Sequence, residues 1–306
     1  MCYDDNFRIM KNILILGGNG YVGSRLRQVL SKIYNVESVD LSDSTDYHDL
    51  TKAELVKYNA IVLLAGHSSV KSCIGDICSP WLNNVTNFTN LLTKLDKDQL
   101  LIYASSSSVY GNNSPGKKHQ EEIIDFTPVN NYDLTKYVLD VTAQLAIKQG
   151  KQLIGLRFGT VNGWSPVLRT DLMINSMYDA ALSQQQITVT NKHINRALLG
   201  IEDLCRAIDT CISAPVAGVY NLASFNTTVD EISHIVSERL QVPIIDFGNT
   251  DGVYDFELDC TKFEKTFDFT FKETPVTIID GLNARYTESK RLKRDDYISY
   301  GWRPKC

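Results

Sequence analysis

The segment Ile13-Leu14-Ile15-Leu16-Gly17-Gly18-Asn19-Gly20-Tyr21-Val22-Gly23 decides the fold class. Its first four residues form an unbroken apolar run closed by glycines, which is typical of a parallel strand buried on both faces. Apolar residues then recur at helical spacing, at Val22, Leu26, Val29, Leu30 and Ile33. The next strand is predicted at Val36–Val39 and ends on Asp40. Together these elements predict a βαβ unit.

A side chain at Gly17, Gly20 or Gly23 would interfere with the expected loop, for a different physical reason at each position. Gly17 permits a tight turn, Gly20 lets backbone N–H groups approach a pyrophosphate, and Gly23 lets the helix pack close to the strand. Asp40 ends the second strand, where a carboxylate can accept hydrogen bonds from the ribose diol of an adenosine. No Arg follows Asp40, and a carboxylate repels a 2′-phosphate. The sequence therefore predicts an NAD site and favours NAD over NADP.

The alternation of strands and helices continues through the first half of the chain. Further strands are predicted at 60–65, 100–104 and 153–158, and helices at 81–95 and from Asn130 or Asn131 to Gly150. The second helix carries an apparent buried stripe of Leu134, Val138, Val141 and Leu145. This pattern predicts an α/β fold with a Rossmann-type, doubly wound parallel sheet, whose ligands lie at the carboxyl ends of the strands.

The second half of the chain is less regular. We expect residues 1–163 to form the NAD-binding domain and residues 164–196 and 224–306 to form a smaller mixed α/β substrate-binding lobe. Residues 197–223 are expected to return to the main sheet.

Composition excludes several classes of protein. The 306 residues carry 31 Lys and Arg against 36 Asp and Glu, without a basic tract that would bind nucleic acid. No apolar run approaches the roughly 20 residues of a membrane span, and the first residues do not resemble a signal peptide. The cysteines and histidines lack the spacing of zinc ligands. We therefore expect a cytoplasmic protein without a membrane, nucleic-acid or metal partner.

A second motif, Tyr132-Asp133-Leu134-Thr135-Lys136, places Tyr132 and Lys136 on one face of a helix. A nearby ammonium group favours the phenolate, so we expect Lys136 to lower the pKa of Tyr132 and make it an acid or base for a substrate hydroxyl. The preceding strand ends in a run of four serines, from Ser105 to Ser108, whose hydroxyls can bind the reacting oxygen.

These motifs together resemble the extended short-chain dehydrogenase/reductase family, in its NAD-dependent nucleotide-sugar epimerase/dehydratase branch. The resemblance covers nearly the whole chain and implies that Ser106, Tyr132 and Lys136 are catalytic. It implies cofactor contacts from Tyr21 and Val22 in the glycine loop, and from Asp49-Leu50 near the adenine. It implies further contacts from Ala65-Gly66-His67.

The same resemblance suggests the substrate side of the site. Candidate substrate-binding residues are Ser107, Thr160, Asp171, Asn175 and Arg196, the last as a phosphate ligand. The 4,6-dehydratases of the family carry Asp-Glu where this chain has Ser107 and Ser108, and the decarboxylases keep that Glu. Alcohol and ketone chemistry on a nucleotide sugar remains.

Three functions stay open at this point. The first is an NAD-dependent nucleotide-sugar epimerase that transiently oxidises the sugar at C4. The second is an NAD(P)-dependent 4-ketoreductase of a 4-keto-6-deoxy nucleotide sugar, which uses the same residues. The third is a non-catalytic dinucleotide-binding regulatory protein. Relatives pair the helices that correspond to 81–95 and 132–149, so the resemblance also implies a homodimer.

Overall fold

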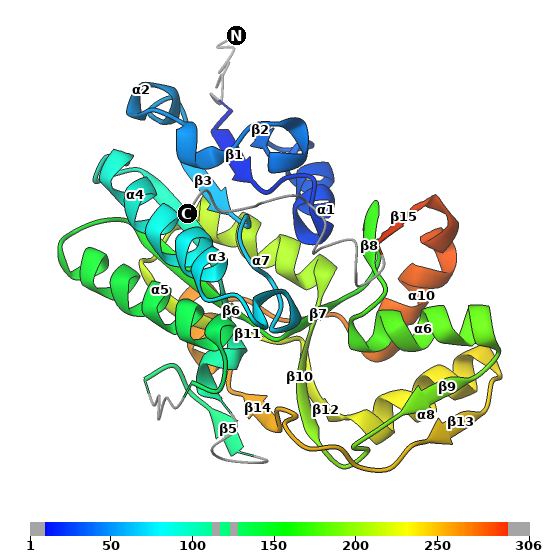
Figure 1. The fold of residues 1–306 in the computed structure, drawn as a ribbon. Coiled ribbons are helices and arrows are strands. Elements are labelled where there is room, and N and C mark those ends of the chain that lie inside the picture. The colour runs from blue at the N-terminus through cyan, green and yellow to red at the C-terminus, as the bar shows by residue number, and fades with distance from the viewer. Residues whose placement is uncertain (1–9, 112–116, 123–127, 293–306) are drawn as a thin grey trace, which may run out of the picture.

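The computed structural model describes residues 10–111, 117–122 and 128–292 (Figure 1). Its main sheet has six parallel strands in the order β11-β6-β4-β3-β1-β2. These strands are β1 (Asn12–Leu16), β2 (Asn35–Val39), β3 (Ala60–Leu63), β4 (Leu100–Ser106), β6 (Leu153–Phe158) and β11 (Gly218–Leu222). β2 and β3 lie on opposite sides of β1, so the loops after β1 and β3 diverge and open a crevice at the carboxyl ends. This is the predicted Rossmann-type sheet.

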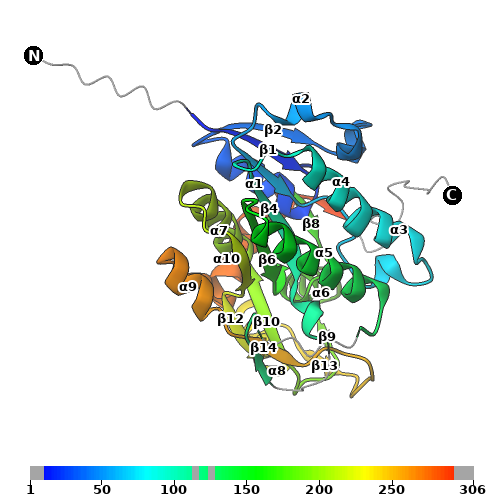
Figure 2. The same ribbon diagram turned by 90° about the vertical axis from the view of Figure 1, so that its left-hand side faces the viewer.

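Helices cover both faces of the sheet, as Figure 2 shows. They are α1 (Tyr21–Leu30) and α7 (Ile201–Ser213) on one face, and α4 (Asn87–Lys94) and α5 (Asn131–Lys148) on the other. Ile13 and Ile15 share a core with α1 and α7, whereas Leu14 and Leu16 share a second core with α4 and α5. Burial on both faces explains why β1 is an uninterrupted apolar run. The turn α2 (Lys52–Leu55) lies between β2 and β3.

The helix predicted at 81–95 is interrupted. α3 (Cys78–Trp81) leads into a π-helical turn, Leu82–Thr86, and only then into α4. The turn contains Asn84, which is buried. Apolar periodicity does not detect such a turn, because one extra residue within an otherwise regular helix leaves most of the pattern intact.

The buried stripe predicted for α5 is wrong. Val141 and Leu145 are 48% and 57% exposed. The buried face instead carries Tyr132, Asp133, Thr135, Lys136, Leu139, Asp140, Ala143 and Ala146. Polar groups can occupy this face because they have partners; the Asp140 carboxylate, for example, forms a 2.7 Å ion pair with Arg157 of β6. α5 therefore buries hydrogen-bonded polar side chains among apolar ones on its inner face, and it exposes Val141 and Leu145 on its outer face.

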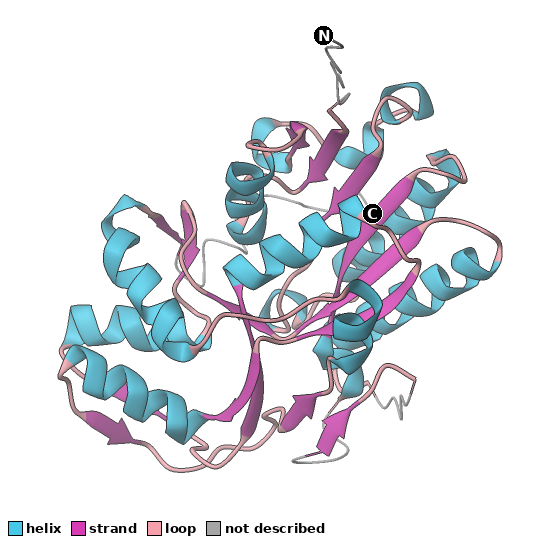
Figure 3. Cartoon of the chain, turned by 180° about the vertical axis from the view of Figure 1, so that it is seen from behind, coloured by secondary structure: helices cyan, strands magenta, loops and turns pink. Residues whose placement is uncertain are grey.

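The smaller lobe surrounds a three-stranded sheet of β7 (Thr160–Asn162), β10 (Asn195–Gly200) and β12 (Phe225–Thr228). Its helices α6 (Met173–Gln184), α8 (Val229–Leu240) and α10 (Pro275–Arg285) pack against one another (Figure 3). α9 (Thr261–Phe267) contacts β11. Three parallel pairs complete the fold: β5 (Lys117–His119) with β14 (Phe256–Leu258), β8 (Val167–Arg169) with β15 (Lys290–Leu292), and β9 (Ile187–Val189) with β13 (Ile244–Asp246).

The segment 197–223 divides between the two sheets. β10 belongs to the three-stranded sheet, whereas α7 and β11 return to the six-stranded one. Within the described ranges, no helix is long and apolar enough to cross a membrane. The same ranges contain no group of three or more His, Cys, Asp or Glu side chains placed to hold a metal ion.

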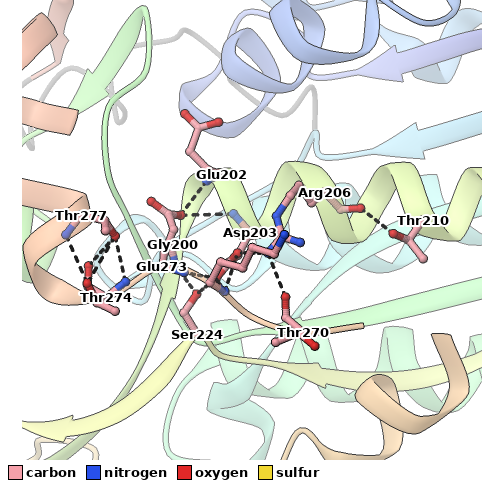
Figure 4. A network of polar contacts seen from close by, with 11 residues as sticks. Gly200, Glu202, Asp203, Arg206, Thr210, Ser224, Thr270, Glu273, Thr274 and Thr277 are labelled. Carbon is pink, nitrogen blue, oxygen red and sulfur yellow. Dashed lines mark hydrogen bonds and ion pairs between the residues drawn. The ribbon is translucent and has the colours of Figure 1, made fainter. Parts of the chain in front are cut away.

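A polar network joins the start of α7 to the segment just before α10 (Figure 4). The Glu273 carboxylate accepts the backbone N–H groups of Glu202 and Asp203 at 2.8 and 3.2 Å, where Gly200 provides no side-chain cap. Asp203 in turn accepts the backbone N–H groups of Lys272 and Glu273. Burial, with a contribution from the Asp203 charge, raises the pKa of Glu273 to about 7.

Candidate active site

A cleft of about 980 Å³ lies at the carboxyl ends of the strands, between the main sheet and the smaller lobe. Most of the predicted site residues line it: Gly17, Gly20, Tyr21, Val22, Gly23, Asp40, Ala65, Gly66, His67, Ser106, Ser107, Tyr132, Lys136, Thr160, Asp171 and Arg196. Asp49, Leu50 and Asn175 do not line it.

The glycine loop forms one edge of this cleft. Gly17 has a φ of +91°, and a Cβ there would lie 2.7 Å from the Ala65 backbone nitrogen. A Cβ on Gly23 would lie 2.1 Å from the Gly17 carbonyl oxygen. Gly20 begins α1 without a side-chain cap, so the N-terminus of this ten-residue helix opens onto the cleft. Such a cradle fits the pyrophosphate of a dinucleotide.

Asp40 lies at the same edge. One carboxylate oxygen accepts the Asn19 backbone N–H at 2.9 Å, and the other accepts the backbone N–H and hydroxyl of Ser42. Arg27 of α1 also lines the cleft here, where it donates to Asn19 and Ser38. Arg27 precedes Asp40 in the chain, so a basic residue sought after Asp40 does not reveal it.

The short turn that contains Asp49 and Leu50 places neither residue in the wall of the cleft. The Asp49 side chain is 82% exposed. Asp46 and Tyr47, at the start of this turn, line the cleft instead, and the Tyr47 hydroxyl donates to the Asn83 carbonyl. Contact of Asp49 and Leu50 with the adenine therefore stays a prediction, whereas Asp46 and Tyr47 already form part of the cleft wall.

Ser106, Tyr132 and Lys136 converge in the middle of the cleft. Ser106 ends β4, where its hydroxyl oxygen accepts the Ser108 backbone N–H at 3.2 Å, and its side chain lies close enough to Tyr132 to affect the pKa of the phenol. Tyr132 lies in the first turn of α5, which Asn130 caps by accepting the Asp133 N–H at 3.0 Å. The Lys136 Nζ atom donates to the Ala104 carbonyl at 2.9 Å and lies 5.9 Å from the centre of the Tyr132 ring. The three side chains come from adjacent elements, β4 and α5.

The charge state of this group differs from the prediction. Burial raises the pKa of Tyr132 to about 12, although the Ser106 hydrogen bond and the Arg169 charge oppose this shift. Burial lowers the pKa of Lys136 to about 8. The expected lowering of the Tyr132 pKa by Lys136 is therefore wrong for this structure, because desolvation outweighs the effect of the ammonium group. Tyr132 is a neutral phenol at pH 7.

Asn84 holds the catalytic helix against the β3 loop. Its side-chain oxygen accepts the His67 backbone N–H at 3.0 Å, and its nitrogen donates to the Thr135 hydroxyl at 3.0 Å. Burial lowers the pKa of His67. The π-helical turn that presents Asn84 thus positions two parts of the cleft wall.

Cations from the smaller lobe form the opposite edge of the cleft. Arg169 pairs with Asp171 through two hydrogen bonds, at 3.0 and 2.8 Å. Arg196 donates to the Tyr254 carbonyl at 3.2 Å and to the Thr160 hydroxyl at 3.5 Å. Sequence reasoning missed Arg169 and Tyr254, since neither lies in a periodic or glycine-marked segment.

Asn175 has a structural position. Its side chain is fully buried, accepts the Gly163 N–H at 2.9 Å and donates to the Arg169 carbonyl at 2.9 Å and the Tyr21 hydroxyl at 3.2 Å. Asn175 therefore does not line the cleft in this structure, and substrate binding by Asn175 stays a prediction. It instead fixes the passage from β7 into the smaller lobe.

Comparisons with known proteins agree with this geometry. Residues 13–223 match the family described as NAD dependent epimerase/dehydratase. The chain belongs to this family. It is therefore an NAD-dependent enzyme, and the resemblance to extended short-chain dehydrogenases/reductases is confirmed.

Individual relatives are distant. Protein CapI of Staphylococcus aureus is 28% identical over 237 residues, which cover 67% of this chain and 70% of that protein. ADP-L-glycero-D-manno-heptose-6-epimerase of Brachyspira hyodysenteriae is 29% identical over 176 residues, covering 49% of this chain and 55% of that protein. A solved UDP-N-acetylglucosamine 4-epimerase from Methanobrevibacter ruminantium, in complex with UDP-N-acetylmuramic acid, has a TM-score of 0.79 at 18% identity. That match covers 91% of this chain and 99% of the other, and it shows the shared fold.

Proposed function

We propose that this protein is a nucleotide-sugar epimerase that transiently oxidises the sugar at C4. The observation that carries the proposal is the convergence of Ser106, Tyr132 and Lys136 in the cleft beside the glycine loop. Ser107 and Ser108 are also consistent with it, because neither supplies the carboxyl group that eliminating a sugar hydroxyl requires. The named relatives act on different sugar carbons, so the choice of C4 is our own.

The chemistry assigned to the side chains follows from their contacts. When bound, NAD supplies a hydride acceptor at the carbon that is oxidised. Tyr132 exchanges a proton with the sugar hydroxyl through its phenol oxygen, and the nearby Ser106 hydroxyl orients the same sugar oxygen. Lys136 places a positive charge one helical turn away, anchored by the Ala104 carbonyl. Oxidation of the sugar requires the Tyr132 phenolate, which takes up the hydroxyl proton, and reduction of the ketone requires the phenol, which returns that proton. Because burial raises the pKa of Tyr132 to about 12 and so favours the phenol, the positive charges of Lys136 and of bound NAD would stabilise the phenolate that begins the cycle.

The lobe edge of the cleft supports a substrate that carries a diphosphate. Arg196 is partly buried, burial lowers its pKa against the opposing charge of Asp255, and its guanidinium group donates to the neutral oxygens of Tyr254 and Thr160. A guanidinium group in that setting is stabilised by an anion. We assign Arg196 to the diphosphate of a nucleotide sugar.

The test begins with protein purified without added cofactor. An epimerase keeps NAD bound through its cycle, so denaturation should release about one dinucleotide per chain. The same preparation should interconvert a C4 epimer pair in a panel of UDP-, ADP-, GDP- and dTDP-sugars without added NADH or NADPH. Turnover only with added reduced cofactor would replace the epimerase with a 4-ketoreductase, and no turnover on any sugar would contradict both enzymes.

The outer face of α5 supports a homodimer as part of this proposal. Val141 and Leu145 expose apolar side chains on the face opposite Tyr132 and Lys136. Burial of such exposed apolar side chains by a second copy of the chain is energetically favourable. We expect a dimer mass by light scattering at micromolar concentration, and a monomer mass for Leu145→Asp. A monomeric wild-type protein would contradict the assembly.

A further inference from the structure

A buried carboxylate beside the catalytic tyrosine has no part in the chemistry described above. Asp133 follows Tyr132 in α5, and none of its surface is exposed. In the part of the chain that the structure describes, no lysine or arginine forms an ion pair with it. Its hydrogen-bond donors are neutral, and burial raises its pKa. Such a group is costly to bury unless its donors are well placed.

The main donor comes from the other side of the cleft. Tyr254 lies between β13 and β14 in the smaller lobe and lines the cleft. Its hydroxyl donates toward both Asp133 carboxylate oxygens, at 2.9 and 2.8 Å. Asn130 completes the group, because its amide nitrogen donates to Asp133 at 2.8 Å and to the Tyr254 hydroxyl at 2.9 Å. A single phenol therefore joins the lobe to the first turn of the catalytic helix.

The same tyrosine also contacts Arg196, the residue that we assign to the substrate diphosphate. Its backbone carbonyl accepts a hydrogen bond from Arg196 at 3.2 Å. The next residue, Asp255, accepts the backbone and side-chain N–H groups of Asn195 at 2.8 and 3.0 Å. The Tyr254 segment is thus fixed to β10 at one end and to α5 at the other.

We propose that Tyr254 is a positioning residue, a clasp that joins Asp133 to Arg196 and sets where the substrate diphosphate lies relative to Tyr132. The inference rests on the proposed function, since it takes Arg196 as the diphosphate ligand. Two hydrogen bonds separate the neighbour of the catalytic phenol from the guanidinium group. Removing the hydroxyl frees the lobe segment without touching the cofactor edge.

The test measures anion binding by the enzyme saturated with NAD, with inorganic pyrophosphate as the probe in isothermal titration calorimetry. Saturation with NAD excludes the probe from the glycine loop. Tyr254→Phe should weaken pyrophosphate binding by about 5- to 10-fold and leave NAD affinity unchanged; this is less than the loss of a direct hydrogen bond to a charged group, because Tyr254 acts through Arg196. Tyr58→Phe is the matched control, because the Tyr58 hydroxyl donates to the Glu37 carboxylate at 2.6 Å and Tyr58 does not line the cleft.

The outcomes separate the clasp from the function on which it rests. If Arg196→Ala loses pyrophosphate binding while Tyr254→Phe binds like the wild type, the clasp is wrong and Arg196 remains the anion ligand. If the wild type and Arg196→Ala bind equally, Arg196 is not the ligand, and both assignments fail. With an accepted nucleotide sugar, Tyr254→Phe should raise KM more than it lowers kcat. An equal fall in kcat and in NAD affinity would indicate a general structural role and overturn the clasp.

Discussion

The two edges of the cleft are built by different means. At the cofactor edge the backbone leaves no room for side chains, because a Cβ on Gly17 or Gly23 would overlap backbone atoms. At the substrate edge, Arg169 and Arg196 are long side chains held by hydrogen bonds to Asp171 and Tyr254. Backbone shape tolerates little variation, whereas side-chain contacts can be exchanged one at a time. We therefore expect substrate choice to depend on the individual side chains at the substrate edge.

The largest effect is expected between the two edges. Tyr132→Phe should lower turnover by about 10² to 10⁴, the usual loss for a general acid or base, and leave NAD binding largely intact. Lys136→Ala should impair both turnover and NAD binding, because Lys136 also lines the cofactor region of the cleft. Steady-state kinetics and NAD titrations on both variants provide the check. Near-wild-type turnover by Tyr132→Phe would remove the assigned acid and base.

A single methyl group should disable the cofactor edge. Gly23→Ala places a Cβ 2.1 Å from the Gly17 carbonyl, so the loop must move, and NAD affinity should fall at least about 10-fold. Gly281→Ala is the matched control, since a Cβ there meets no atom within 4 Å. Calorimetric titration of both variants with NAD measures the difference. Equal affinities would show that the loop has room that the geometry denies.

Cofactor choice should change by a smaller factor. Asp40→Asn removes a charge that repels a 2′-phosphate, while Arg27 remains at the same edge. The ratio of NADP to NAD affinity should rise about 10-fold. Asp43→Asn is the control, because Asp43 accepts from Asn19 at 2.7 Å but does not line the cleft. The idea is rejected if Asp43→Asn shifts the ratio as much as Asp40→Asn does.

The last expected effect concerns stability and lies outside both edges. Burial raises the pKa of Glu273 to about 7 from 4.5, so the folded state binds its proton more tightly than the unfolded state. Its contribution to stability is complete below about pH 4.5 and is lost as the pH rises through about 7. Glu273→Gln should remove that loss and raise the free energy of unfolding at pH 8, relative to pH 5, by on the order of 1–3 kcal/mol. Denaturant unfolding of both proteins at pH 5 and pH 8 measures this difference. An equal change in the free energy of unfolding for the wild type and Glu273→Gln would contradict the prediction.

The comparison of the two edges also explains what the sequence could predict. Gly17, Gly20, Gly23 and Asp40 are recognisable because strand, turn and helix force their spacing. Ser106, Tyr132 and Lys136 are recognisable because adjacent elements bring them together. The parallel sheet follows from the same alternation of strands and helices, since each strand is buried on both faces.

The remaining residues depend on contacts that no local pattern records. Asp46 and Tyr47 line the cleft and Asp49 does not, because only the start of their short turn reaches the cleft. Asn175 had the residue type of a ligand but is used to hold Gly163. The stripe containing Val141 and Leu145 was misread because the catalytic helix buries hydrogen-bonded polar groups, which apolar periodicity counts as exposed.

The most direct measurement of the central claim follows the hydrogen at C4 of the sugar. A nucleotide sugar that the protein epimerises is prepared with deuterium at C4 and converted in ordinary water, and the epimer is examined by mass spectrometry and NMR. Transient oxidation with the hydride returned to the opposite face predicts that the epimer keeps its deuterium at C4. An epimer that has lost deuterium to water, or one inverted at a carbon other than C4, would contradict the proposed reaction.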